Sequence, residues 1–286
     1  MVKHPPLFIL LGLFVFLAPV SSLYGQGDAA SPSSAPAPAL SHWIEKIQTR
    51  RGTWTGLKAD VTLRFKNAAG DSAACEGTLV YHRLEERILL QCYQKSETQT
   101  PYTVFALKTS DREFELYLPA HQTLYKGTIF GLADSPSINS HLRAWDLYRA
   151  FKPAAIPSEN VTIKTLADGT TLLKVMKIKD EKEWRAREIA VSKDGDLPAE
   201  VYFGPTGTPS LKIERSQFEI FSETSSGTFP KKIRLTSKRN AADKNSFDKT
   251  TFEFKKIQLL SELSENDFEM NLPQNTHVMV LEEMLE

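Results

Sequence analysis

Apolar and polar residues alternate along much of this sequence with the period of two that is typical of β-strands. The alternation is clearest in Lys58–Lys66, and five further alternating segments follow before residue 128, separated by short polar turns. This pattern predicts a six-stranded antiparallel meander from Leu57 to Gly127. The apolar face of its first strand consists of Ala59, Val61, Leu63 and Phe65.

Strand-like segments resume after residue 160 and continue almost to the C-terminus. Asp168-Gly169 and Asp194-Gly195 each lie between two such segments, where this dipeptide is a strong hairpin signal. The whole chain therefore predicts about a dozen strands, a number at which a twisted sheet tends to curl or split. We predict one mainly β domain over residues 41–286, built on a curled antiparallel sheet with two or three helices.

Two segments have helical periodicity. Ser41–Arg51 is predicted to be a helix with Ser41 as its N-cap, with Trp43, Ile44 and Ile47 on one face, and with Gly52 ending it.

A second helix is predicted at Ser140–Phe151, inserted between two blocks of strands. It either packs on the sheet as ordinary core or covers a cavity, and an aromatic stripe taken alone favours core packing. The stripe consists of Leu142, Trp145, Tyr148 and Phe151.

The two cysteines fall on adjacent predicted strands that form a hairpin around Arg83 and Leu84. A register that places Leu79 opposite Ile88 also places Cys75 opposite Cys92. This register predicts a cross-strand disulfide, which an oxidising compartment would allow, and two buried free thiols are the alternative.

The N-terminus has the features of a secretory signal peptide. Lys3 precedes the 14-residue apolar run Leu7–Val20, and small residues follow it. A membrane anchor would need about 20 apolar residues, so we predict a signal peptide over residues 1–25. Residues 26–40 are rich in Ala, Ser and Pro and are predicted to be a linker.

Charge and motifs exclude several classes of function. Lys plus Arg and Asp plus Glu are each 35, so no global basic field would draw the protein to nucleic acid. The six histidines are scattered without metal-ligand spacing, and the nucleotide-binding and hydrolase motifs are missing from the sequence. We therefore predict no enzyme activity, no metal site and no cofactor.

Three stretches resemble the LolA-like family of periplasmic carriers of outer-membrane lipoproteins. They are ACEGTLVYHRLEERILLQCY, LKTSDREFELYLPAHQTLYKG with Tyr117, Pro119 and Gln122 at characteristic positions, and the ending NDFEMNLPQNTHVMVLEE. The resemblance implies an incomplete, half-open antiparallel β-barrel of about eleven to thirteen strands, with helices at its mouth. It also implies a periplasmic location, a hydrophobic cavity for the acyl chains of lipoproteins or lipids, and transfer proteins of the inner and outer membranes as partners.

The resemblance also suggests residues for the site. Arg83 falls where the family has an arginine that helps to hold the lid, so we expect it to act as a latch between the strands and the covering segment. The expected cavity lining combines apolar strand residues with residues of the covering helix. These are Val61, Leu63, Phe65, Leu79, Leu90 and Leu116 from the strands, and Leu142, Trp145 and Tyr148 from the helix.

A second function belongs to another class. Lipoprotein-sensing periplasmic proteins share this fold and bind a partner protein as well as lipid, and a fold does not determine a function. The alternative is therefore a regulatory or interaction domain.

Overall fold

The computed structural model describes residues 39–95, 101–110, 113–128, 144–151, 155–179, 182–222, 226–238 and 247–281. The predicted signal peptide and nearly all of the predicted linker lie outside these residues, and so do Leu142 and the start of the covering helix. In the described part of the chain, no helix is long and apolar enough to cross a membrane.

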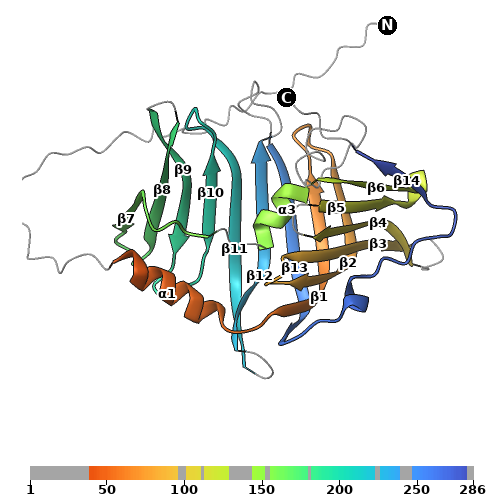
Figure 1. The fold of residues 1–286 in the computed structure, drawn as a ribbon, viewed down its shortest axis with the longest axis horizontal. Helices are drawn as coiled ribbons and strands as arrows, with labels where there is room; N and C mark the ends of the chain where they lie inside the picture. Colours follow the sequence, from red (N-terminus) through yellow and green to blue (C-terminus); the bar gives the residue numbers. More distant parts are fainter. Residues whose placement is uncertain are drawn as a thin grey trace, which may run out of the picture. The chain divides into compact units, whose positions relative to one another are not determined.

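The described residues form one open sheet, as the alternation and the resemblance predict (Figure 1). It has fourteen strands, slightly more than the eleven to thirteen expected. The strands in chain order are β1 Gly56–Lys66, β2 Ser72–His82, β3 Arg87–Lys95, β4 Pro101–Ser110, β5 Glu113–Leu118, β6 Thr123–Thr128, β7 Val161–Thr165, β8 Thr171–Lys179, β9 Lys182–Val191, β10 Ala199–Phe203, β11 Pro209–Phe221, β12 Gly227–Lys238, β13 Phe247–Leu260 and β14 His277–Val280.

The order of the strands explains how the sheet is built. It runs β14-β6-β5-β4-β3-β2-β1-β13-β12-β11-β10-β9-β8-β7, and every pair is antiparallel except β14 with β6. The chain thus lays down β1 to β6 outward from the centre, crosses to β7 at the far edge, and returns inward until β13 pairs with β1. The described parts of this crossing are helix α3, Ala144–Phe151, and residues 155–160.

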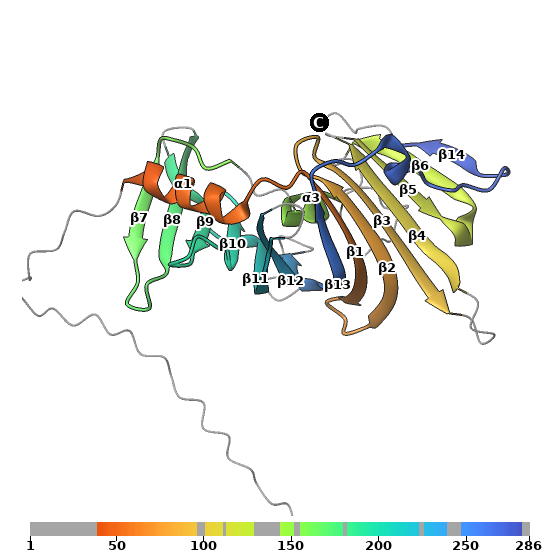
Figure 2. The same cartoon turned by 90° about the horizontal axis from the view of Figure 1, so that it is seen from below.

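The concave side of the curved sheet carries the main apolar core, and α3 lies on this side (Figure 2). The face of β1 that the alternation predicts to be apolar points into this core, because Ala59, Val61 and Leu63 are buried and Phe65 packs against them. On the other face, Ala106, Tyr117 and Leu124 form a small cluster with the C-terminal segment after the short 3-10 helix η2, Glu265–Phe268. A second such helix, η1, spans Pro119–His121 between β5 and β6.

Helix α1, Leu40–Arg51, packs its buried Trp43 and Ile47 on β8, β9 and the β9–β10 connection. The expected end is confirmed, since Gly52 adopts a φ of 74° there. The expected cap is wrong: the helix begins one residue earlier, so Ser41 lies inside it, and Ala39 at the N-cap position makes no side-chain hydrogen bond.

A disulfide joins Cys75 to Cys92, with their Cα atoms 5.9 Å apart. The register that suggested it is wrong by two residues, because Leu79 pairs with Leu90 and Cys92 lies opposite Gly77. The hairpin turn takes four residues between His82 and Arg87 instead of two. The disulfide therefore runs diagonally, beside a glycine at which a Cβ would come within 2.2 Å of the Gln91 carbonyl oxygen.

The disulfide is expected to stabilise the hairpin by restricting the unfolded chain. It closes a loop with a sequence separation of 17, for which the chain-entropy model gives about 3 kcal/mol. The double variant Cys75→Ala/Cys92→Ala should lose about 2–4 kcal/mol of unfolding free energy in urea denaturation. A reductant should lower the urea midpoint of the wild type and leave the midpoint of the double variant unchanged. Equal midpoints for both proteins, each with and without reductant, would contradict the expectation.

Candidate ligand cavity

The structure brings the described part of the expected lining into one cluster. Five strand residues are at most 4% exposed, and Phe65 packs on the same cluster. Tyr148 reaches the cluster from α3, whereas Leu142 and the side chain of Trp145 lie outside the described residues. The five buried strand residues are Val61, Leu63, Leu79, Leu90 and Leu116.

Helix α3 fills the concave face above this cluster. Leu147 is fully buried, and Phe151 is the centre of an aromatic group. The ring of Phe151 lies 5.7 Å from Tyr81, 5.9 Å from Phe252 and Phe254, and 6.5 Å from Phe229, measured between centroids. Described side chains of α3 therefore pack directly against the apolar residues of the concave face.

Polar contacts help to hold α3 on the sheet. The hydroxyl of Tyr81 donates to the carbonyl oxygen of Phe151 at 3.2 Å, and Nη2 of Arg215 donates to the carbonyl oxygen of Ala150 at 3.0 Å. Both acceptors belong to the last turn of the helix, where carbonyls lack partners within the helix and a cation is favourable. The hydroxyl of Tyr148 donates to the carboxylate of Glu86 in the β2–β3 turn.

Arg215 belongs to a buried ionic network on three neighbouring strands. The carboxylate of Glu200 on β10 is fully buried and accepts from Nε of Arg187 on β9 at 2.6 Å and from Nη2 of Arg215 on β11 at 3.4 Å. The hydroxyl of Tyr202 donates to the same carboxylate. Arg187 also donates to the carbonyl oxygen of Ala155, just beyond α3. The network therefore anchors the chain on both sides of residues 152–154.

Sequence reasoning missed these charged residues, although the sequence carries a signal for them. Arg187 continues the buried face of Ile189 and Val191, and Arg215 continues the face of Leu211 and Ile213. A charged residue that takes an apolar position in a period-two strand must find a partner there, because a buried unpaired charge is very costly. Three such positions on consecutive strands predict a buried ionic cluster.

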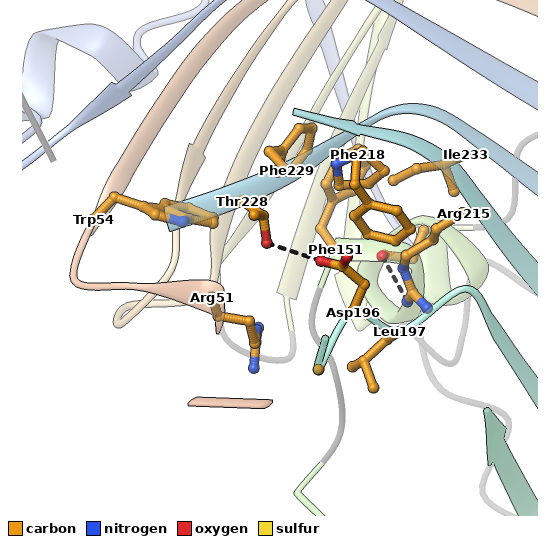
Figure 3. A pocket seen from close by; sticks show the side chains of 13 residues that line it. Arg51, Trp54, Phe151, Asp196, Leu197, Arg215, Phe218, Thr228, Phe229 and Ile233 are labelled. Carbon is orange, nitrogen blue, oxygen red and sulfur yellow. Dashed lines mark hydrogen bonds between the residues drawn. The ribbon is translucent and has the colours of Figure 1, made fainter. Parts of the chain in front are cut away.

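A cavity of about 60 Å³ lies under the C-terminal end of α3 (Figure 3). A cavity of about 150 Å³ is known to hold benzene, and ligand pockets generally measure about 300–1,000 Å³. This cavity is therefore too small for an acyl chain. The lining comes from α1, the α1–β1 connection, α3, the β9–β10 connection, β11 and β12. It consists of Arg51, Trp54, Ala150, Phe151, Gly195, Asp196, Leu197, Arg215, Phe218, Thr228, Phe229, Pro230 and Ile233.

Two arginines give this small cavity its electrostatic character. Burial lowers the pKa of the Arg51 guanidinium to about 10, and the nearby Arg83 and Arg215 act in the same direction. Asp196 lies between Arg51 and Arg215 in Figure 3, and its carboxylate accepts two hydrogen bonds from Arg50, at 2.9 and 3.0 Å, and one from the Thr228 hydroxyl at 3.2 Å. Its charge is thus already paired with Arg50.

Arg83 is placed between α1 and the concave core. Its Nη1 donates to the carbonyl oxygen of Gly52 at 3.1 Å, and its guanidinium carbon lies 4.7 Å from the centre of the Trp54 ring. Trp54 in turn contacts Tyr81, the residue that holds the end of α3. The covering loop that Arg83 was expected to contact lies in residues 129–143, outside the described part of the chain.

Two wider hollows lie elsewhere on the sheet. One of about 400 Å³ is lined by polar residues beside Arg87 and Glu265, and one of about 350 Å³ lies between the ends of β11, β12 and β13. Neither is lined by a residue of α3. Among the described residues, no group of three His, Cys, Asp or Glu side chains is placed to bind a metal ion.

Comparison with known proteins supports the fold. No protein-family model matches the sequence, and no curated protein matches it. An outer membrane lipoprotein-sorting protein domain from Vibrio parahaemolyticus aligns with a TM-score of 0.53 at 14% identity, over 79% of this chain and 94% of its own. A LolA superfamily protein from Nitrosomonas europaea aligns with a TM-score of 0.51 at 10% identity, over 82% of this chain and 99% of its own. The chain has a LolA-like fold.

The Tyr81 hydroxyl is expected to hold the last turn of α3. Because Tyr81→Phe removes only this hydrogen bond, local opening of α3 should become easier by about 0.5–1.5 kcal/mol. Hydrogen exchange of the peptide that contains residues 144–151 measures this change. The matched control is Tyr93→Phe, which removes a hydroxyl bonded to Gln91 on β3, away from α3. Equal exchange of α3 in both variants would show that Tyr81 does not hold the helix.

Proposed function

We propose that this chain is a periplasmic carrier that shields acyl chains of lipids or lipoproteins and delivers them towards the outer membrane. The observation that supports it most is the position of α3. A short helix with an apolar face packs on the concave face of a LolA-like half-barrel, and polar contacts tether it there. In the proposed cycle, the acyl chain takes the place of this helix.

The free energies of burying α3 and of burying an acyl chain favour this exchange. Exposing the side chains of Leu147, Tyr148 and Phe151 costs about 5–9 kcal/mol, at about 1.5–3 kcal/mol for each large apolar side chain. An acyl chain of about 16 carbons gains about 12 kcal/mol on burial, at about 0.8 kcal/mol for each methylene. The difference leaves room to break the polar contacts of α3. A closed empty state and an open loaded state are thus both accessible.

The lining of the loaded state would be strand residues of the core cluster to which α3 also belongs. Val61, Leu63, Leu79, Leu90 and Leu116 offer a continuous apolar wall in the core cluster, and Phe65 lies at its margin. Leu142, Trp145 and Tyr148 would form the moving cover. Transfer proteins of the inner and outer membranes would load and unload such a carrier.

We further propose Arg83 as a latch that acts through its neighbours. It fixes Trp54 by stacking and by its bond to Gly52, Trp54 packs on Tyr81, and Tyr81 holds Phe151. Arg83→Leu would remove the contacts of Arg83 with Gly52 and Trp54 and so loosen the support of Tyr81 and α3. The stacking and the hydrogen bond together contribute about 1–2 kcal/mol.

Native mass spectrometry of the protein, purified from periplasm without detergent, tests the function. We expect co-purifying lipid or acylated peptide, and we expect Arg83→Leu to retain it roughly tenfold more tightly and to release it to vesicles more slowly, because about 1–2 kcal/mol no longer favours the closed state with α3 in place. The matched control is Arg64→Leu, which removes an exposed arginine of β1 that is paired with Glu253 of β13. This variant should release lipid at the wild-type rate.

Other outcomes of the same experiment contradict specific parts of the proposal. A lipid-free protein in a stable complex with another protein would contradict the carrier and support a regulatory domain. Unchanged retention and release in Arg83→Leu would contradict the latch alone.

A further inference from the structure

The cavity under α3 is lined by hydrogen-bond donors that lack acceptors. Nη1 of Arg215 and Nε1 of Trp54 are buried, and neither has a hydrogen-bond partner among the described residues. Arg215 is 8% exposed and Trp54 is 3% exposed. Buried donors are nearly always satisfied in proteins, and both of these groups can only donate. The missing component of this cavity is therefore an acceptor.

The charges around the cavity have the same implication. The nearby carboxylates are already engaged, since Asp196 is bound by Arg50 and Glu200 is bound by Arg187 at 2.6 Å, against 3.4 Å to Arg215. Arg51 and Arg215 therefore add positive charge that these carboxylates only partly balance. Figure 3 shows Arg51 and Trp54 on one side of the cavity and Arg215 on the other. The lining suits a group that is both an acceptor and an anion, and guanidinium groups bind carboxylates and phosphates strongly.

The cavity adjoins the concave core through the residues they share. Phe151 and Phe229 line the cavity, and both also belong to the aromatic group with Phe254. A ligand whose acyl chain replaced Phe151 would therefore have its head end beside Arg51 and Arg215. With α3 in place, the volume of about 60 Å³ is room for a few water molecules.

We propose that Arg51, Arg215 and Trp54 form a headgroup site for the carboxylate or phosphate of an anionic acyl ligand. The proposal rests on the carrier function and narrows it to anionic lipids. In the loaded protein, the anion accepts hydrogen bonds from Nη1 of Arg215, from the Arg51 guanidinium and from Nε1 of Trp54, while the acyl chain lies on the concave face.

Calorimetric titration of the full mature protein with three matched amphiphiles tests the site. Dodecanoate presents a carboxylate, dodecyl phosphate presents a phosphate and dodecanol presents a neutral headgroup on the same chain. We expect one of the anions to bind at least tenfold more tightly than dodecanol, and the preferred anion identifies the source of the charge. Arg51→Gln should lose most of this preference, and Arg51→Lys should keep part of it because the charge remains.

The matched control is Arg234→Gln, which removes the same charge from the exposed face of β12, between the buried Ile233 and Leu235. It should keep the wild-type preference. Equal affinities of the wild type for the three amphiphiles would overturn the headgroup site and leave the carrier function intact. Binding of none of them would overturn both. An equal loss in Arg51→Gln and Arg234→Gln would show a general charge effect and would overturn the assignment to this cavity.

Discussion

The curved sheet cannot leave its apolar concave face in water, and the rest of the structure depends on how that face is covered. The strand order supplies the cover, because the chain must cross from β6 to β7 at the far edge of the sheet. Helix α3 lies within this crossing and buries Leu147 and Phe151 against the strands. A chain that runs over a face is easier to displace than a strand within the sheet, because it shares no ladder of hydrogen bonds with its neighbours.

Polar groups under α3 determine where this cover is held. Glu200 brings Arg187 and Arg215 together inside the sheet, and each arginine donates to a main-chain carbonyl close to the end of the helix. Such a buried network is costly to assemble and specific in its geometry. It fixes the C-terminal end of the crossing while the apolar side chains fill the barrel. Arg215 also belongs to the proposed headgroup site, which links the cover to that site.

Much of the fold could be predicted from the sequence, because strand alternation directly reports which face is buried. The cysteine register could not, because a shift of two residues preserves every face and only the length of the turn distinguishes the registers. The observed four-residue turn includes Glu86 at a φ of 57°, which no local pattern indicated. The meeting of Arg187, Glu200 and Arg215 with α3 depends on contacts between distant segments, although each residue alone is visible as a charge on an apolar face.

The central claim is that an acyl ligand and α3 compete for the same face. Hydrogen exchange of the peptide containing residues 144–151, followed while dodecanoate is added, tests it most directly. The account predicts that α3 loses protection as the ligand binds, whereas the peptides of β1 and β2 keep theirs. Binding that leaves α3 as protected as in the free protein would contradict the account.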